Sequence, residues 1–208
     1  MKKDYKSITD SEATYPTIIK SFLNKEKALF INNYLRSSKL KGQLNGLGLR
    51  ANAEDFGVGP KKDLSNINDP NYKIIHHELN KAFQEILSLF YQDYEIEPGK
   101  LSFKNSIYYV MLKGAHGPEH IDEVIELGIK EYENPGEILC YSALLYLNND
   151  YKGGEIYFPK VNMSIHPEPG DLIYFRGDNR IPHGINEILD GERCNIIIFF
   201  EIFPSKDN

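Results

Sequence analysis

The feature that most constrains the fold of this chain is a series of short apolar segments in its second half. The segments begin at residue 101 and are separated by Gly, Pro or Asn-Asp breaks. Short strand-like segments with regular breaks are typical of a β-sandwich or a β-barrel. The predicted strands cover residues 101–112, 137–147, 155–158, 161–165, 171–175, 181–187 and 193–203.

The first half of the chain carries helix signals instead. One helix is predicted from Asn24, a capping residue, to about Ser37, because apolar residues recur at helical spacing between them. A second helix is predicted from Asp69 to about Tyr91, and Pro70 stands at its first helical position. Helices followed by strands predict an α+β chain with a jelly-roll core.

The domain organisation follows from these two halves. We expect a single domain over residues 1–208, in which residues 1–100 form a helical N-terminal support and residues 101–208 form the jelly-roll core. Between the two helices, residues 40–68 contain several glycines and lose apolar periodicity, which predicts a loop. Such a long loop is either a lid or a disordered segment. Arg50 is its candidate substrate contact.

Composition limits the partners of the chain. A net charge of −6 and a pI of about 5.6 give no support for nucleic-acid or anionic-membrane binding. No apolar run approaches the roughly 20 residues that span a bilayer, and no signal peptide is recognisable at the N-terminus. Cys140 and Cys194 lie in apolar runs and are interpreted as buried thiols in a reducing compartment. We therefore expect a cytoplasmic protein.

The second half also carries residues with the chemistry of a binding site. His183 follows a proline, and Arg193 stands ten positions further on, at the start of a continuous apolar run. A neutral imidazole can hold a transition metal. An arginine that enters a buried strand needs a partner, and a carboxylate in a two-pronged pair is the simplest one. This stretch therefore predicts a metal ligand and an anchor for an acid, on neighbouring strands.

Upstream, His120 and Asp122 are separated by one residue. Residues two apart in an extended chain point to the same face, so this imidazole and this carboxylate converge. Together with His183 they form a set of two histidines and one carboxylate, which suits non-haem Fe(II) and leaves three positions open on a six-coordinate metal. Zinc or manganese are alternatives for the same ligands, and three unrelated polar residues at strand ends are the opposing interpretation.

The spacing of His120-x-Asp122, His183 and Arg193 resembles that of the iron(II)- and 2-oxoglutarate-dependent oxygenases of the prolyl 4-hydroxylase type. The resemblance covers about residues 101–203 and includes further motifs in the same order. These motifs are Tyr146-Leu147-Asn148, Gly153-Gly154-Glu155, Phe158-Pro159 and Pro169-Gly170-Asp171-Leu172-Ile173-Tyr174-Phe175. The resemblance implies a double-stranded β-helix with N-terminal helices packed on one sheet.

The resemblance also implies a set of site residues and cofactors. Fe(II) is expected at a catalytic site formed by His120, Asp122 and His183. The expected cosubstrates are 2-oxoglutarate and dioxygen, with ascorbate as a supporting reductant. Arg193 would bind the distal carboxylate of 2-oxoglutarate, and Tyr146 would donate its hydroxyl to the same acid. Many relatives carry a tyrosine where this chain has Met111, and Tyr109 on the same face of the strand is the predicted replacement.

The predicted activity is hydroxylation of a C–H bond, in a prolyl residue of a peptide or protein, with release of succinate and CO2. The alternatives are hydroxylation of a free amino acid or other small molecule, and a jelly-roll binding or scaffold protein that is not an enzyme. A nucleic-acid demethylase is disfavoured, because such relatives carry a second arginine where this chain has Phe199. Arg180, near the expected mouth of the barrel, is a second candidate substrate contact, with a surface ion pair as the competing interpretation.

Overall fold

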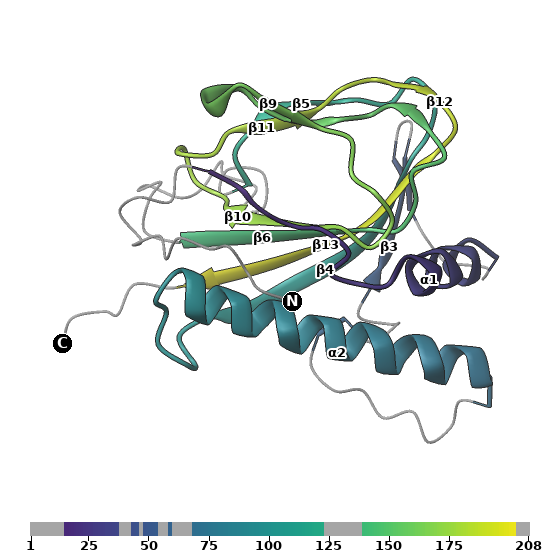
Figure 1. The fold of residues 1–208 in the computed structure, drawn as a ribbon, viewed down its shortest axis with the longest axis horizontal. Coiled ribbons are helices and arrows are strands. Elements are labelled where there is room, and N and C mark those ends of the chain that lie inside the picture. The colour runs from purple at the N-terminus through teal and green to yellow at the C-terminus, as the bar shows by residue number, and fades with distance from the viewer. Residues whose placement is uncertain are drawn as a thin grey trace.

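Two β-sheets face each other, and both helices pack on the outer side of the larger sheet (Figure 1). The computed structural model describes residues 15–37, 43–45, 48–53, 58–59, 68–122 and 139–202. This is the α+β jelly-roll that the order of helices and strands predicted. None of the helices formed by these residues has the length and apolar character needed to cross a membrane.

The larger sheet has seven antiparallel strands in the order β1-β10-β6-β13-β4-β3-β2. Its centre is the long pair β4 and β13, which extends along nearly the whole length of both strands. The strands of this sheet are β1 (Thr17–Ile19), β2 (Gln43–Asn45), β3 (Gly48–Asn52), β4 (Ser102–Met111), β6 (Leu139–Tyr146), β10 (Leu172–Arg176) and β13 (Arg193–Ile202).

The smaller sheet has four antiparallel strands in the order β5-β11-β8-β9, and β12 pairs with β7 in a separate ribbon. These strands are β5 (Gly117–His120), β7 (Lys152–Gly153), β8 (Ile156–Phe158), β9 (Met163–Ile165), β11 (His183–Ile185) and β12 (Ile188–Asp190), and the 3-10 turn η2 (Pro159–Val161) joins β8 to β9. The chain therefore passes repeatedly from one sheet to the other, as in a double-stranded β-helix.

Both helices begin at the predicted caps. In α1 (Lys25–Ser37) the Asn24 side chain accepts hydrogen bonds from the backbone N–H groups of the first turn, at 2.9 and 3.2 Å. In α2 (Pro70–Asp93) the Asp69 carboxylate does the same at 2.9 and 3.3 Å. These caps satisfy donors that have no partner inside a helix. The two predicted helices are confirmed.

An aromatic cluster holds α2 against the large sheet. Phe90 is fully buried, and its ring packs against those of four other aromatic residues at centroid distances of 5.2 to 5.7 Å. These partners are Tyr94, Tyr141, Tyr174 and Phe200. Aromatic rings contribute large buried areas, so this cluster fixes the helix on the outer face of the sheet.

The two faces of β13 explain how one strand serves both the core and a site. Cys194, Ile196 and Ile198 belong to the apolar core between the sheet and the helices. The alternate residues Arg193 and Ile197 line a cavity between the two sheets. This alternation is the period of two expected for a strand that is covered on both faces.

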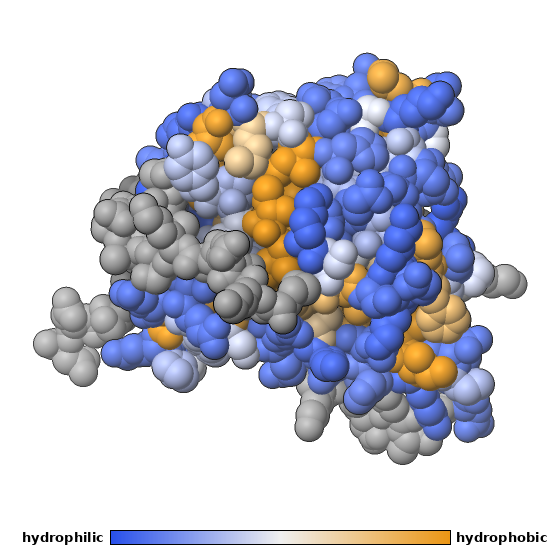
Figure 2. Space-filling model, viewed as in Figure 1, coloured by the Kyte–Doolittle hydropathy of each residue, from blue (hydrophilic) through white to orange (hydrophobic). Residues whose placement is uncertain are grey.

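The surface in Figure 2 is mostly hydrophilic, with one narrow apolar strip at the level of the space between the two sheets. The edge strands of the sheets also carry apolar side chains that are only partly buried. Ile18 of β1 and Met163 and Ile165 of β9 pack against the apolar cluster that fills the space between the sheets. Two short edge strands, β1 and β9, therefore help to cover the cluster between the sheets.

The expectation of a loop over residues 40–68 is wrong in part. β2 and β3 lie in this segment and extend the large sheet beyond β4. Gly48 is one reason for the glycine content, because a Cβ on it would lie 2.7 Å from the Tyr109 ring. The remainder of the segment lies outside the described residues, so its role as a lid stays a prediction.

A second expectation, that His183 and Arg193 lie on neighbouring strands, is also wrong. His183 begins β11 in the small sheet, whereas Arg193 begins β13 in the large sheet. The turn at Gly191 does not form a hairpin with β13, because the intervening strand β12 pairs with β7. The two residues therefore face one cavity from opposite sheets.

Candidate metal centre and acid-binding pocket

His120, Asp122 and His183 come together at one end of the space between the sheets. Each offers one ligand atom, and these atoms all lie within 4.8 Å of one another. Nε2 of His120 lies 3.4 Å from Oδ1 of Asp122, and Nε2 of His183 lies 3.7 Å from the same oxygen. His120 and His183 are direct partners in the register of β5 and β11. Sheet pairing therefore brings the two imidazoles to the carboxylate.

The second nitrogen of each imidazole faces a backbone carbonyl. Nδ1 of His120 lies 2.8 Å from the carbonyl oxygen of Pro118, and Nδ1 of His183 lies 3.3 Å from that of Ile181. A carbonyl can only accept, so it favours the tautomer with a proton on Nδ1. That tautomer leaves the Nε2 lone pair for a metal, which is the usual arrangement around metal-binding histidines.

Asp122 is held from the large sheet. The hydroxyl of Ser142, on β6, donates a hydrogen bond to Oδ2 of Asp122. Oδ1 is then the oxygen that faces both histidines. Two imidazole nitrogens and one such carboxylate oxygen suit Fe(II) with further coordination positions open, so the donor set fits the predicted metal.

The ionisation of these groups also suits metal binding. Burial lowers the pKa of His183, so its imidazole is neutral at pH 7. Burial raises the pKa of Asp122, but attraction to the His183 imidazole, which is protonated at the acid pH where Asp122 titrates, and hydrogen bonds from His120 and Ser142 outweigh it and lower that pKa. Burial also lowers the pKa of His120, but its contacts with Asp122 and the Pro118 carbonyl raise it overall. A metal must therefore compete with a proton at His120 more than at His183.

A cavity of about 210 Å³ extends from the three ligands into the space between the sheets. Its walls are mainly apolar, with Arg193 and Tyr109 among the polar exceptions. The apolar part of the lining consists of Ile107, Met111, Leu144, Ile185, Ile197 and Phe199. A small apolar cavity with a few convergent polar groups is typical of a site for a small ligand.

Arg193 is the buried cation of this cavity, with only 1% of its surface exposed. One terminal nitrogen donates to the Tyr146 hydroxyl oxygen at 2.7 Å, and the other donates to the Asn195 side-chain oxygen at 3.0 Å. The terminal nitrogen that donates to Asn195 also donates to the sulfur of Met111 at 3.4 Å. Among the residues that the structure describes, no Asp or Glu forms an ion pair with Arg193. A buried guanidinium with only neutral partners is suited to an incoming carboxylate.

Further donors around Arg193 lack an acceptor within the described part of the chain. They are Nε of Arg193, Nδ2 of Asn195 and the hydroxyl of Tyr151. Tyr151 and Arg193 both border Gly154, since a Cβ there would lie 3.2 Å from the Tyr151 ring and 3.4 Å from Cδ of Arg193. Burial raises the pKa of Tyr146 and that of Tyr151, so both hydroxyls keep their protons. This end of the cavity is therefore rich in donors, as a site for an acid requires.

The structure brings together six of the predicted site residues and leaves Arg180 outside the group. His120, Asp122, His183 and Arg193 line one cavity, and Tyr146 contacts Arg193 from β6. Tyr109 lines the same cavity from β4, but no hydrogen bond joins it to Arg193. Arg180 lies outside the lining and forms an ion pair with Asp178. Arg50 lies in β3, opposite Tyr109 in the register, and its side chain lies outside the described part.

Three residues at the site were not found from the sequence. They are Ser142, which donates to Asp122, Asn195, which accepts from Arg193, and Tyr151, which borders Gly154 together with Arg193. Asn195 alone had a local signal, because it follows Arg193 by two positions on a strand and therefore shares its face. Ser142 and Tyr151 belong to distant segments and had no such signal.

The comparisons with known proteins agree with this geometry. Residues 106–201 match the family model described as the 2OG-Fe(II) oxygenase superfamily. Prolyl 3-hydroxylase 2 of Rattus norvegicus is 39% identical over 69 residues, which are 31% of this chain and 10% of that protein. Prolyl 3-hydroxylase 1 of Homo sapiens is 36% identical over 69 residues, which are 31% of this chain and 9% of that protein. The matched segment is thus about a tenth of these curated relatives.

Solved structures share the fold at low sequence identity. The viral collagen prolyl hydroxylase of Paramecium bursaria Chlorella virus-1, in its 2-oxoglutarate complex, has a TM-score of 0.63 at 15% identity, covering 91% of this chain and 97% of that one. A prolyl hydroxylase of Trichoplax adhaerens, in complex with a hypoxia inducible factor peptide fragment, has a TM-score of 0.57 at 18% identity, covering 92% and 84%.

The family prediction is therefore confirmed at the level of the match: residues 106–201 match the 2OG-Fe(II) oxygenase superfamily, and the chain shares the fold of solved prolyl hydroxylases. The jelly-roll prediction is confirmed with it. The match to this superfamily implies Fe(II), 2-oxoglutarate and dioxygen as the metal and the cosubstrates.

Proposed function

We propose that this protein is an iron(II)- and 2-oxoglutarate-dependent dioxygenase that hydroxylates a prolyl residue of a peptide or protein. The observation that carries the proposal is the cavity between the sheets. The His120–Asp122–His183 cluster lines one part of this cavity, and Arg193 lines another part. Among the described residues, Arg193 has no carboxylate partner. A metal-chelating oxo acid with a second carboxylate matches this pair of subsites.

The residues of the cavity have distinct roles in the proposal. His120, Asp122 and His183 would hold iron(II), which together with 2-oxoglutarate and dioxygen supplies the oxidising power for breaking a C–H bond. Arg193 would bind the distal carboxylate in a charge-assisted pair. The Tyr146 oxygen accepts from Arg193, so its proton remains available for the same carboxylate.

The apolar lining has a role of its own. Side chains such as Leu144, Ile197 and Phe199 exclude water from the space beside the metal ligands. In the overall reaction one oxygen atom of O2 becomes the hydroxyl of the product and the other enters the new carboxylate of succinate, while CO2 leaves. Loss of CO2 from the oxo acid supplies two electrons, and the C–H bond supplies the other two, so the reaction balances.

A peptide substrate is supported by two observations. The curated relatives that match this chain include prolyl 3-hydroxylases, and a structural neighbour from Trichoplax adhaerens was solved with a peptide. In addition, the residues that line the cavity beside His120 include the exposed His116 and Pro118, so the cavity opens at the surface next to the metal ligands. An opening beside the metal admits one side chain of a longer chain.

The test is a substrate screen of the purified protein with Fe(II), 2-oxoglutarate and ascorbate. Proline-containing peptides and free amino acids are compared, and each is analysed for a mass gain of one oxygen atom alongside succinate release. We expect oxygen transfer to a peptide, and none with Asp122→Ala. Transfer only to a free amino acid would contradict the peptide substrate. Absence of Fe(II) binding and of 2-oxoglutarate turnover would contradict the activity itself.

A further inference from the structure

The loop of residues 177–182 crosses from one sheet to the other at the metal end of the cavity. It leaves the large sheet at Arg176, the last residue of β10, and enters the small sheet at His183, the first residue of β11. The loop therefore ends on a predicted metal ligand. Its conformation helps to orient that ligand, whose place in the small sheet is set by the register of β11 with β5.

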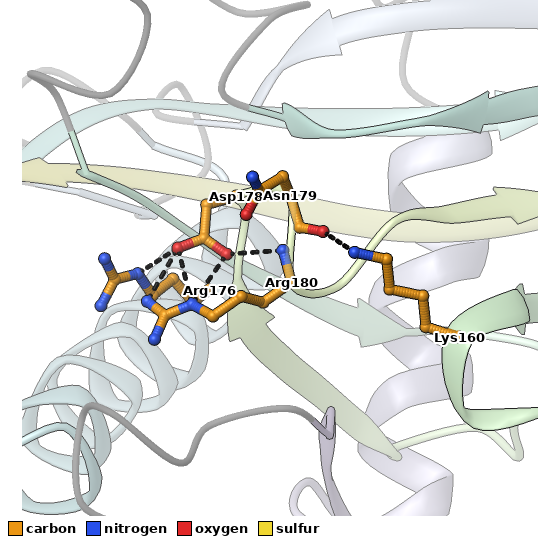
Figure 3. Close-up of polar contacts among 5 residues, drawn as sticks. All are labelled: Lys160, Arg176, Asp178, Asn179 and Arg180. Carbon is orange, nitrogen blue, oxygen red and sulfur yellow. Dashed lines mark hydrogen bonds and ion pairs between the residues drawn. The ribbon is translucent and has the colours of Figure 1, made fainter.

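A buried carboxylate organises this loop. Asp178 is 7% exposed, and Figure 3 shows its carboxylate between the side chains of Arg176 and Arg180. The Arg180 guanidinium donates to both carboxylate oxygens at 2.8 to 3.2 Å, and its backbone N–H donates to one of them at 3.0 Å. Nε of Arg176 forms an ion pair with the same carboxylate. Charge-assisted contacts of this kind hold a partly buried loop more firmly than neutral ones.

The loop is also tied to its surroundings by backbone contacts. The N–H of Gly177 donates to the Cys140 carbonyl on β6 at 2.8 Å. The carbonyl of Asn179 accepts a hydrogen bond from Lys160 of η2, which Figure 3 also shows. These contacts anchor the loop to β6 of the large sheet and to the turn that joins β8 to β9.

The loop touches two of the three metal ligands. A Cβ on Gly177 would lie 2.9 Å from Cβ of Asp122, so the backbone at this position packs directly on that ligand. The Ile181 N–H donates to the backbone carbonyl of Asp178 at 3.1 Å, and the Ile181 carbonyl lies 3.3 Å from Nδ1 of His183. The carboxylate of Asp178 thus fixes the turn whose ends orient Asp122 and His183.

We propose that Asp178 is a positioning residue of the metal centre, which acts by clamping the 177–182 loop through Arg176 and Arg180. The inference rests on the metal site of the proposed function. Asp178 does not bind the metal and lies outside the cavity lining. Its effect is on the geometry of Asp122 and His183, so it should be visible as metal affinity.

The test compares two matched substitutions in the full chain. Asp178→Asn keeps the shape of the side chain and removes its charge. Asp190, on β12, forms an exposed ion pair with Lys113, and Asp190→Asn makes the same chemical change there. Affinity for Fe(II) is measured by anaerobic calorimetry, well below the unfolding temperature of each metal-free variant. We expect Asp178→Asn to weaken Fe(II) binding roughly tenfold, at the lower end of the effect of residues that support metal ligands. Asp190→Asn should stay within about twofold of wild type.

A second pair of variants keeps the inference testable if Asp178→Asn does not fold. Arg180→Gln removes the guanidinium but leaves Asp178 and Arg176 in place, and we expect a loss of Fe(II) affinity of several-fold. Arg180→Lys keeps the charge and should recover part of that loss. Wild-type Fe(II) affinity in the folded Asp178→Asn and Arg180→Gln proteins would overturn the inference, even if both unfold at a lower temperature. Absence of Fe(II) binding by the wild type would instead overturn the metal site and the inference with it.

Discussion

His120 and His183 oppose each other in the register of β5 and β11, and their ring centroids lie 4.5 Å apart. Opposing residues of an antiparallel pair place their side chains on the same face, so the strand pairing alone brings two potential ligands together. Asp122 follows His120 by two positions and completes the cluster. The metal centre is therefore built mainly by sheet register, and it should tolerate changes in loops that do not touch this pair.

The first prediction concerns the carboxylate ligand. The protein should bind one Fe(II) per chain, and Asp122→Ala should weaken binding more than about 100-fold, beyond the effect expected for supporting residues. The reason is that the substitution removes the only carboxylate of the cluster. Anaerobic titration and metal content after gel filtration measure this loss, with Asp190→Asn as the control. Full iron occupancy and turnover in Asp122→Ala would remove Asp122 from the site.

The second prediction concerns the acid anchor. Arg193→Ala should weaken 2-oxoglutarate binding by about 2–5 kcal/mol, because a buried charge-assisted pair is lost. Arg193→Lys should be impaired less, since the charge remains but the two-pronged geometry is lost.

The control for this prediction is a change of ligand. A 2-oxo acid that lacks the distal carboxylate shares only the chelating end with 2-oxoglutarate. This acid should bind the wild type more weakly than 2-oxoglutarate does. Its affinity should change little in Arg193→Ala. If Arg193→Ala keeps the Michaelis constant of the wild type for 2-oxoglutarate, another residue is the anchor.

Much of the fold and site followed from local patterns in the sequence. The helix caps Asn24 and Asp69 act through neighbouring residues, so they were readable directly. His120, Asp122, His183 and Arg193 were found because strand periodicity and motif spacing are local properties, and the structure places all four around one cavity.

The rest depends on contacts between distant segments. β3 pairs with β4 although it lies in a glycine-rich segment, and Gly48 at its start leaves room for the ring of Tyr109. The separation of His183 and Arg193 onto two sheets depends on the partner of β12, which no local signal gives. No local signal gives the hydrogen bond from Ser142 to Asp122 either, because it joins two distant segments.

The third prediction separates the hydroxyls near Arg193. Tyr146→Phe should weaken 2-oxoglutarate binding by about 1 kcal/mol, which corresponds to roughly fivefold, because one hydrogen bond to the acid and one from Arg193 are lost. Tyr109→Phe tests the predicted second hydroxyl, and Tyr151→Phe tests the buried hydroxyl that has no acceptor among the described residues. Calorimetric titration of the Fe(II)-loaded proteins compares all three. Equal affinity in Tyr146→Phe and wild type would exclude that tyrosine from the acid subsite.

The fourth prediction concerns the attachment of α2 to the large sheet. Phe90→Ala should lower the free energy of unfolding by about 3–5 kcal/mol, because it removes the ring at the centre of a buried aromatic cluster. Ile74→Ala on the same helix is the control, since Ile74 is 52% exposed, and it should change stability by no more than about 0.5 kcal/mol. Urea unfolding of the metal-free proteins measures both. A similar small effect in both variants would show that the cluster does not hold the helix.

The last prediction concerns acid stability and tests the clamp by a route independent of metal. Burial raises the pKa of Asp178, but hydrogen bonds from Arg180 and the charges of Arg176 and Arg180 outweigh it, so the pKa lies below its ordinary value of 3.8. The folded protein therefore keeps this carboxylate ionised at a pH where the unfolded chain binds a proton. The resulting stabilisation is present above about pH 4 and is lost as the pH falls through the folded-state pKa.

Asp178→Asn cannot bind this proton, so its free energy of unfolding should fall less steeply than that of the wild type below about pH 4. Above that pH the variant should be less stable than the wild type, because the two arginines lose their anionic partner. Urea unfolding of the metal-free proteins from about pH 6 to about pH 2.5 gives the two curves, and Asp190→Asn should follow the wild type. Parallel curves for Asp178→Asn and wild type throughout this range would show that the Asp178 carboxylate is not held by the arginines in solution.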